Sequence, residues 1–341
     1  MIASLGYLFS LTLGHSHNSL IPWLVSCSLM KIEREVVDWL LEEDQPAVRY
    51  YTLVDLLDRS QRDAEVKQAY ANISRKGWAF DILSKQKEKG YWESRKSLYR
   101  PKYTATNWRA IVLSDLGLTS KNKRISKMAD LFFKDWLALP SGENIFNDEV
   151  CIVGNTARML TRFGYEDDFR VKKLFDRLIE DQKDDGGWHC FESSHGTLDC
   201  WEGLAAFAAL PKSKRTRSIK SSIERGAEFC LERKLFHEGR YLPWFQFHYP
   251  NHYYYDILVG LDVITKLGYG GDKRLLAPLK ILNEKRIDGK WLLDRIHPDI
   301  GSGAQYRLRR NVKPFALEEP GKPSKWITLT ALRVLKRVES S

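Results

Sequence analysis

Charged residues are missing from the first 29 positions, which contain no Lys, Arg, Asp or Glu. A secretory signal peptide begins with basic residues, so this absence argues against one, although residues 24–27, "LVSC", have the shape of a lipoprotein cleavage site. The apolar stretch at 4–14 is shorter than the ~20 residues needed to cross a bilayer, so no transmembrane segment is expected. We expect residues 1–29 to be a non-core extension and Met30 to be the true start, because residues 30–44 open an amphipathic helix.

Cysteine is also scarce and unpatterned, with five residues, an odd number, and no CxxC pair. This usage favours a reducing compartment, so we expect a cytoplasmic protein. The formal net charge of +10 favours anionic partners. However, the basic residues are spread among 44 acidic ones, and no nucleic-acid-binding module is recognisable, so a nucleic acid partner is not expected. The oligomeric state is not set by any of these features.

Alternating β-type patterns are missing as well. From Met30 onward apolar residues recur at spacings of three and four, which predicts an all-α fold in a single domain over residues 30–341. The expected helices cover residues 31–43, 46–58, 63–85, 105–117, 123–138, 149–164, 169–182, 197–210, 215–234, 253–268, 272–286 and 324–338.

The predicted helices repeat with a period of roughly 45 to 55 residues, in which a mostly apolar helix alternates with an amphipathic one. An apolar helix needs cover on most sides, whereas an amphipathic helix needs cover on one face. We therefore expect stacked helical hairpins with apolar helices inside and amphipathic helices outside. Periodicity alone leaves open whether the array closes into a ring or stays an open solenoid.

Two short segments between these helices have the same pattern, "QKEKGYW" at 86–92 and "QKDDGGW" at 182–188. In the second segment we expect Gln182 to donate to the last carbonyls of the preceding helix, Gly186 or Gly187 to take the left-handed conformation, and Trp188 to cover the junction. Residues 285–291 and 237–241 keep the pattern in part. Such segments would tie one hairpin to the next.

These junctions resemble the repeats of the terpenoid cyclase and protein prenyltransferase superfamily of α/α toroids, which includes squalene-hopene cyclases. The resemblance covers residues 44–337 and implies a barrel of inner and outer helices around an apolar cavity. The superfamily's Asp-x-Asp-Asp acid motif is missing here, and we interpret the nearest match, at 165–169, as the start of an outer helix. The zinc ligands of prenyltransferase β subunits are not reproduced either, because Asp199 and Cys200 are adjacent and His252 is displaced by one position.

A cluster of metal-ligand residue types surrounds the third apolar helix, at 188–203. If the starts of the inner helices meet at one rim, Cys151, Cys190, His195 and Cys200 are candidate ligands for zinc, which accepts cysteine and histidine. The spacing matches no established metal motif, and buried cysteines without a ligand are common. Zinc is therefore one of two interpretations, and unliganded cysteines are the other.

Polar and aromatic groups on the apolar helices are candidates for catalysis or substrate binding, because a buried polar group demands a partner. An acid whose pKa is raised by burial and an arginine that holds an anionic group are the expected functional types. The alternative is that these residues only cap helices or pair with one another. The candidate catalytic residues are Asp199, Glu202 and His195, and the candidate substrate-binding residues are Trp108, Arg109, Asn155, Arg158, Tyr255, Asp256 and Trp326.

The resemblance implies a prenyltransferase-like or terpene-cyclase-like protein that binds an isoprenoid or other long apolar substrate in a central cavity, without a motif that defines the reaction. The alternative is a catalytically silent toroid that acts as a lipid-binding or protein-interaction scaffold. The aromatic content of 12% and the His/Cys/Asp cluster favour the first hypothesis, and the missing motifs favour the second. An open aromatic cavity that exposes Asp199 or Glu202 would support the enzyme.

Overall fold

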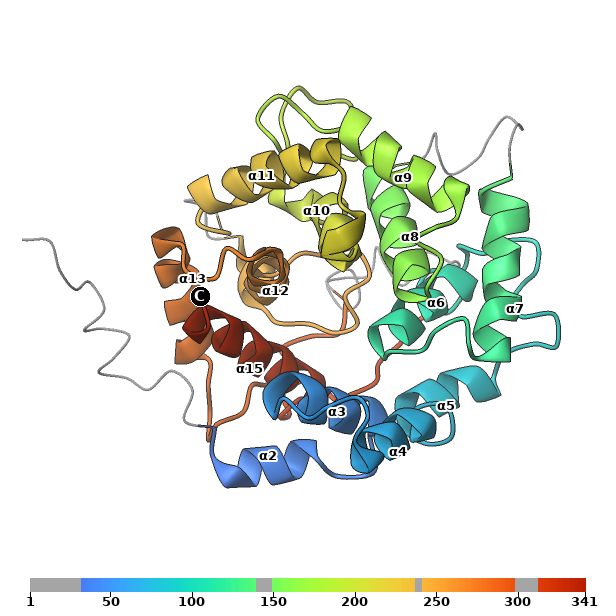
Figure 1. Cartoon of the computed structure of the whole chain (residues 1–341), viewed down its shortest axis with the longest axis vertical. Helices are drawn as coiled ribbons and strands as arrows, with labels where there is room; N and C mark the ends of the chain where they lie inside the picture. Colours follow the sequence, from blue (N-terminus) through green and yellow to red (C-terminus); the bar gives the residue numbers. More distant parts are fainter. Residues whose placement is uncertain (1–31, 139–148, 237–240, 298–311) are drawn as a thin grey trace, which may run out of the picture.

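The computed structural model describes residues 32–138, 149–236, 241–297 and 312–341 (Figure 1). These residues form helices joined by irregular connections, and their β-pairing is limited to isolated bridges such as Trp188 with Thr197. The all-α prediction is therefore confirmed. No described helix is both long enough and apolar enough to cross a bilayer. The extension 1–29 and most of the junction copy at 237–241 lie outside the described residues.

The helices follow one another in the order expected for repeated hairpins. They are α2 (Arg34–Leu40), α3 (Pro46–Tyr51), α4 (Ala64–Asn72), α5 (Gly77–Ser84), α6 (Thr106–Asp115), α7 (Lys123–Leu131), α8 (Val150–Arg162), α9 (Phe169–Glu180), α10 (Glu202–Ala209), α11 (Arg217–Glu232), α12 (Ile257–Leu267), α13 (Leu276–Glu284) and α15 (Lys325–Glu339). A π-helical turn, Thr52–Leu56, continues α3.

The helices fall into two groups by burial. Helices α6, α8, α10, α12 and α15 lie toward the centre of Figure 1 and are buried on most sides, and we call them the inner helices. Helices α7, α9, α11 and α13 lie toward the edge, and we call them the outer helices. In α9 the buried residues are Val171, Leu174, Phe175 and Leu178, which form the single apolar stripe of an amphipathic helix. The expected division into apolar and amphipathic helices is present in the described residues.

Each inner helix packs against the next one along the chain, from α6 through α8, α10 and α12 to α15. Helix α15 then packs against α3 and the π-helical turn, near the other end of the chain. Between α3 and α6, the ring of Tyr51 approaches Gly117, where an added Cβ would lie 2.8 Å from the Tyr51 hydroxyl. The contacts between inner helices therefore connect the last described helix to the first hairpin.

The two junction segments have the same hydrogen bonds, which differ in one respect from the expectation. The indole Nε1 of Trp188 donates to the Leu178 carbonyl in the last turns of α9 over 2.8 Å. Gln182 Nε2 instead donates to Gly186 O at 2.7 Å and to Ser222 O on α11 at 2.9 Å. The indole therefore satisfies the helix end and the glutamine connects two outer helices.

The copy at 86–92 shows that this arrangement recurs. Trp92 Nε1 donates to Ile82 O at 2.8 Å, and Gln86 Nε2 donates to Gly90 O at 3.1 Å and to Arg124 O on α7 at 3.0 Å. Gly90 and Gly186 have φ values of 90° and 87°, in the left-handed region that favours glycine. The prediction that these segments tie hairpins together is confirmed.

Several helix predictions were wrong in their boundaries, including the one at 197–210, where α10 begins at Glu202 after a separate 3-10 turn, Leu198–Cys200. Residues 63–85 form α4 and α5 rather than one helix, because Gly77 has a φ of 72° and an added Cβ there would lie 2.7 Å from the Asp44 carbonyl oxygen. Helix α12 begins at Ile257 rather than at 253, because the Asp256 carboxylate accepts the Val259 N–H and caps the helix. The segment at 165–169 begins α9 as interpreted, with Asp168 accepting the Arg170 N–H at 2.8 Å.

Candidate functional site

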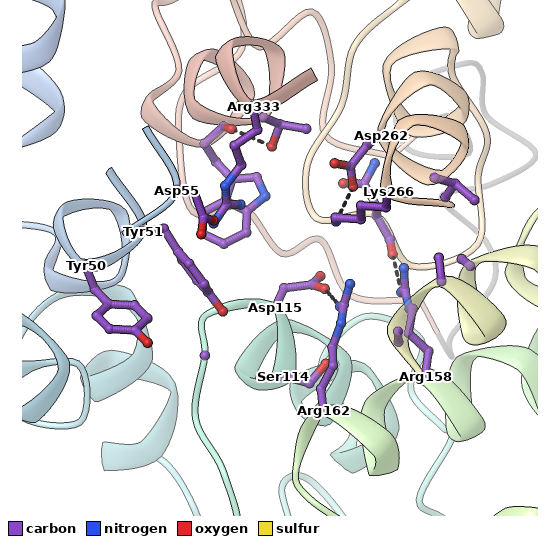
Figure 2. Close-up of a pocket in the computed structure, with 18 of the residues that line it drawn as sticks. Tyr50, Tyr51, Asp55, Ser114, Asp115, Arg158, Arg162, Asp262, Lys266 and Arg333 are labelled. Atoms are coloured by element: carbon purple, nitrogen blue, oxygen red, sulfur yellow. Dashed lines mark hydrogen bonds and ion pairs between the residues drawn. The ribbon is translucent and has the colours of Figure 1, made fainter. Parts of the chain in front are cut away.

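A cavity of about 800 Å³ lies among the inner helices, and most of its charged residues are near their carboxyl-terminal ends (Figure 2). Its walls come from α3, the π-helical turn after it, and helices α4, α6, α8, α10, α12 and α15. Residues that are far apart in the sequence therefore meet around this cavity. The volume is within the range of about 300 to 1,000 Å³ that is usual for small-molecule sites.

The cavity walls are rich in charge and carry an excess of positive side chains. Seven Lys or Arg residues line the cavity, against four Asp residues. The basic residues are Lys67, Lys121, Arg158, Arg162, Lys266, Arg333 and Arg337, and the acidic residues are Asp55, Asp115, Asp256 and Asp262. A concave surface with this balance attracts anions.

Asp262 on α12 is the centre of one group of ion pairs. Its carboxylate lies 2.5 Å from Lys266 Nζ and 2.6 Å from an Arg337 nitrogen. Burial alone would raise the pKa of Asp262, but Lys266 and Arg337 outweigh burial and lower it. Burial lowers the pKa of Lys266 to about 8, partly opposed by Asp262. Lys266 is therefore a cavity amine that titrates close to neutral pH.

Two further ion pairs cross the cavity between different elements. Arg162 on α8 pairs with Asp115 at the end of α6, and Arg333 on α15 pairs with Asp55 in the π-helical turn. Each arginine holds five N–H donors in a planar fork, which suits carboxylate and phosphate groups. A bound anion would therefore meet arginine donors from opposite walls.

Arg158 is a buried cavity cation that forms no ion pair with a carboxylate of the described residues, whereas Lys67 and Lys121, which also form none, are exposed. Its NH2 group donates to Asn155 Oδ1 at 2.8 Å and to Asn251 O at 3.2 Å, and its Cζ lies 4.8 Å from the Trp201 ring centroid. Burial lowers the pKa of Arg158 to about 10, so it remains charged at neutral pH. An unneutralised buried cation at the cavity wall favours an anionic ligand.

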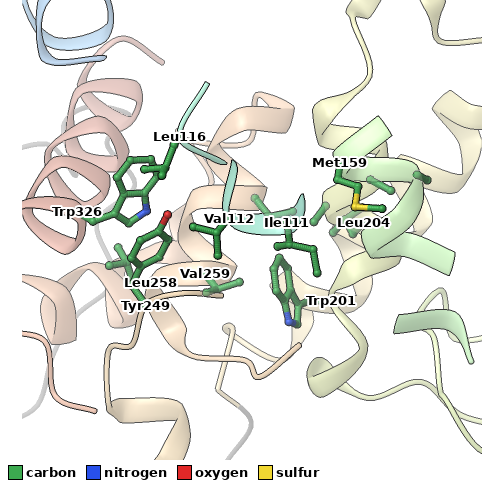
Figure 3. Packing of buried hydrophobic residues seen from close by; sticks show 14 of the residues in the cluster. Ile111, Val112, Leu116, Met159, Trp201, Leu204, Tyr249, Leu258, Val259 and Trp326 are labelled. Carbon is green, nitrogen blue, oxygen red and sulfur yellow. The ribbon is translucent and has the colours of Figure 1, made fainter. Parts of the chain in front are cut away.

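The apolar part of the lining lies next to these charges. Trp201, Leu258, Val259 and Trp326 contribute to the cavity wall and belong to the buried core around it (Figure 3). Behind them Tyr249 stacks on Trp326 with ring centroids 4.8 Å apart. The cavity therefore offers both a cationic surface and an aromatic surface to one ligand.

Three of the predicted substrate-binding residues line the cavity, namely Arg158, Asp256 and Trp326. Asp256 is held in place by His248, whose backbone N–H and ring Nδ1 lie 3.0 and 2.7 Å from its Oδ2. The expected pairing of Arg158 with Glu202 is not among its hydrogen bonds, which go to Asn155 and a backbone carbonyl.

The other predicted substrate-binding residues lie outside the cavity and make structural contacts. Trp108 donates to Tyr99 O at 2.6 Å, and Tyr255 donates to Leu235 O at 2.7 Å. Asn155 donates to His252 O at 2.5 Å, and the Arg109 guanidinium lies 3.7 Å from the Phe315 ring centroid. Burial lowers the pKa of Arg109 to about 10.

The predicted catalytic residues are dispersed at the other end of the inner helices and do not line the cavity. Asp199 accepts a hydrogen bond from Trp244 Nε1 at 2.7 Å, and His195 is exposed on the connection before it. Glu202 is fully buried, neither carboxylate oxygen has a hydrogen-bond partner, and burial followed by the charge of Cys190 raises its pKa well above the usual value. The cavity is open, as the enzyme hypothesis requires, but neither of these acids faces it.

Three of the four predicted metal ligands come together. Cys190 Sγ lies 3.3 Å from Cys200 Sγ, and the ligand atoms of Glu149, Cys151 and Cys190 all lie within 4.8 Å of one another. The exposed His195 is not part of this group, and Glu149 was not predicted. The three thiols named from the sequence therefore lie near one another, and the sequence analysis did not name the carboxylate beside them.

Sequence reasoning missed most of the cavity. It selected polar residues near the starts of the inner helices, whereas the cavity charges lie one or two turns from their ends, as Arg162, Asp262 and Lys266 do. A signal was present, since Asp262 and Lys266 are four residues apart within an otherwise apolar helix. In comparisons with known proteins, no family model, no curated protein and no solved structure matches this chain.

Proposed function

We propose that the inner and outer helices form a closed α/α toroid of the terpenoid cyclase and protein prenyltransferase type. The order of contacts among the inner helices, with α15 packed against α3, supports a closed ring. The junctions at residues 86–92 and 182–188 support the same conclusion, since each one ties an outer helix to the next. On this proposal the charged cavity is the centre of the toroid.

We propose that this cavity binds an amphipathic anion of the isoprenoid diphosphate kind. The observation that carries the proposal is the lining itself, in which seven basic side chains face four acidic ones beside an aromatic wall. Arginine donors and Lys266 would bind the anionic group, because charge-assisted hydrogen bonds to phosphate oxygens are strong. Trp201, Trp326 and Val259 would contact the apolar chain.

The arrangement supports binding more directly than it supports a particular reaction. Asp199 and Glu202 are outside the cavity, so they do not supply an acid to a ligand there. Lys266, with a pKa lowered by burial to about 8, is the cavity side chain best suited to exchange a proton near neutral pH. Any proton transfer to a bound ligand would therefore involve Lys266 rather than the predicted acids.

Calorimetric titration of the full chain with farnesyl diphosphate, inorganic diphosphate and farnesol tests this proposal. We expect farnesyl diphosphate to bind more tightly than either half of the molecule alone. Lys266→Met removes one cation and leaves Asp262 paired with Arg337, so it should weaken farnesyl diphosphate binding at least tenfold without unfolding the chain. The matched control is Lys280→Met on α13, whose ammonium pairs only with exposed Glu284 and should leave binding unchanged.

The competing hypothesis is a toroid that is a scaffold without a small-molecule ligand. It is favoured if none of the three probes binds and native mass spectrometry finds no molecule bound to the purified chain. Farnesol that binds as tightly as farnesyl diphosphate, together with farnesyl diphosphate binding that is unchanged in the Lys266→Met variant, would show that the cations have no role in recognition. Either result would overturn the proposal of an anionic ligand.

A further inference from the structure

We propose that Glu149, Cys151, Cys190 and Cys200 form a binding site for a thiophilic divalent cation, with Zn²⁺ the best fit. The site lies at the amino-terminal ends of α8 and α10, and none of its four residues lines the cavity, although Trp201, next to Cys200, does. Cys151 and Arg162 are eleven residues apart on α8, which corresponds to about 16 Å along the helix. The proposal therefore does not depend on the identity of the cavity ligand.

The donor atoms are already close together. Cys151 Sγ lies 3.6 Å from Glu149 Oε2, and Cys190 Sγ lies within 4.8 Å of both of these atoms. Cys200 Sγ lies 3.3 Å from Cys190 Sγ but not within 4.8 Å of all three other donor atoms, so it would have to move inward to supply a fourth donor. Two thiolates on a tetrahedral zinc lie about 3.8 Å apart, so Cys190 and Cys200 would separate by about half an ångström when the ion binds.

The backbone holds these donors at one rim for reasons that do not involve the sulfurs. Helices α8 and α10 cross closely at Gly154, where an added Cβ would lie 2.6 to 2.8 Å from atoms of Glu202. This crossing brings Cys151, one turn before Gly154, beside the start of α10. The connection that carries Cys190 is closed by the bridge between Trp188 and Thr197, whose N–H donates to Trp188 O at 2.8 Å.

The electrostatics of this rim favour a cation. Glu202 is fully buried beside the cysteines, and neither of its carboxylate oxygens has a hydrogen-bond partner. No Lys or Arg of the described ranges forms an ion pair with Glu202. A divalent ion would neutralise the thiolates, and its binding would release the thiol protons to solvent.

The test is metal titration of the full chain, stripped with a chelator and kept under a thiol-free reductant. We expect one equivalent of Co²⁺ to bind and to show the thiolate charge-transfer absorption and the visible bands of a tetrahedral cobalt site. One equivalent of Zn²⁺ should then displace the cobalt and abolish these bands. A wild-type chain that binds well under half an equivalent of either metal would overturn the proposal.

Cysteine variants separate this site from adventitious binding. Cys190→Ser and Cys200→Ser should each weaken Co²⁺ binding at least tenfold and reduce the charge-transfer absorption, whereas Cys230→Ser on α11, away from the cluster, should change neither. Helical circular dichroism of each variant checks that it is folded. Equal metal binding in all three variants would mean an adventitious ion only. A Cys190–Cys200 disulfide found by mass spectrometry in the reduced, metal-treated chain would also contradict the proposal.

Discussion

Buried polar groups are stabilised differently at the two ends of the inner helices. At the carboxyl-terminal end, Asp262, Asp115 and Asp55 each lie against a cation, so most of the charge is neutralised within the chain. At the amino-terminal end, Glu202 and His252 are fully or almost fully buried and have side-chain atoms without hydrogen-bond partners. The first end gains stability from its charges, while the second tolerates groups that favour their neutral forms.

This difference shows in the pKa values. Lysine and arginine neighbours lower the pKa of Asp262 despite its burial, so its charged form is the stable one. Burial, and then the nearby His297, lowers the pKa of His252 well below its ordinary value, so its neutral form is the stable one. The same low-dielectric interior therefore has opposite effects, depending on whether a partner of opposite sign is present.

The largest effect is expected from removing the acid at the carboxyl-terminal end. Asp262→Asn leaves Lys266 and Arg337 without their carboxylate, and because these side chains are partly exposed, the loss of unfolding free energy should approach but not reach the ~3 to 5 kcal/mol that breaking a fully buried pair costs. The control is Asp167→Asn, which removes an exposed partner of Lys214 and should cost less than about 1 kcal/mol. Urea unfolding of both variants measures the difference, and equal losses would mean that the cavity pairs contribute no more than surface pairs.

A smaller loss is expected at the amino-terminal end from Gly154→Ala. The new Cβ would lie 2.6 Å from the Glu202 carbonyl carbon, so α8 and α10 must move apart, at a cost of about 1 to 3 kcal/mol. The matched change Gly271→Ala meets only Ser341 at 3.6 Å or more and should have no measurable effect on the unfolding free energy. Thermal unfolding compares the two, and an unchanged midpoint for Gly154→Ala would contradict the close crossing.

A loss of stability that grows with acidity is expected as the pH is lowered, and it should come from the amino-terminal end first. Burial lowers the pKa of His297 from 6.5 to about 3, so below pH 6.5 the unfolded chain takes up a proton that the folded chain refuses. Stability should therefore be complete above pH 6.5 and fall by at most about 1.4 kcal/mol per pH unit for each such histidine as the pH decreases toward 3. The contribution of Asp262, whose folded pKa is lowered, is lost only below about pH 4.

Unfolding free energies measured between pH 7 and pH 5 give this slope directly. His297→Gln should reduce the slope, whereas His195→Gln, at an exposed position, should leave it unchanged. A stability that stays constant from pH 7 to pH 5 and falls only near pH 4 would show that the buried histidines do not control the acid response.

The parts of the fold that were predictable are those set by neighbouring residues. The junctions at 86–92 and 182–188 could be predicted because their glycines and tryptophans act within a few residues of one another. The break at Gly77 could not, because the apolar periodicity continues across it and the strain appears only when Asp44 of an earlier connection is in place. Local patterns thus identified the helices better than their interruptions.

The same difference between short-range and long-range contacts explains why the cysteine cluster was easier to predict than the cavity. Cys190 and Cys200 are ten residues apart, so their proximity could be anticipated from one connection. Asp115 and Arg162 are 47 residues apart on different helices, and their pairing depends on how those helices are packed side by side. A cavity whose walls come from seven helices has no continuous sequence pattern.

Helix α15 makes one wall of the cavity and covers the apolar flank of α12. It is also held to the first hairpin, since Lys325 lies 2.6 Å from Asp44 and Lys336 lies 2.6 Å from Asp58. On the ribosome, all of its partners are synthesised before it is. Until α15 emerges from the exit tunnel, the apolar flank of α12 is exposed, and other nascent chains can bind it. We therefore expect the need for a chaperone to be greatest in this interval.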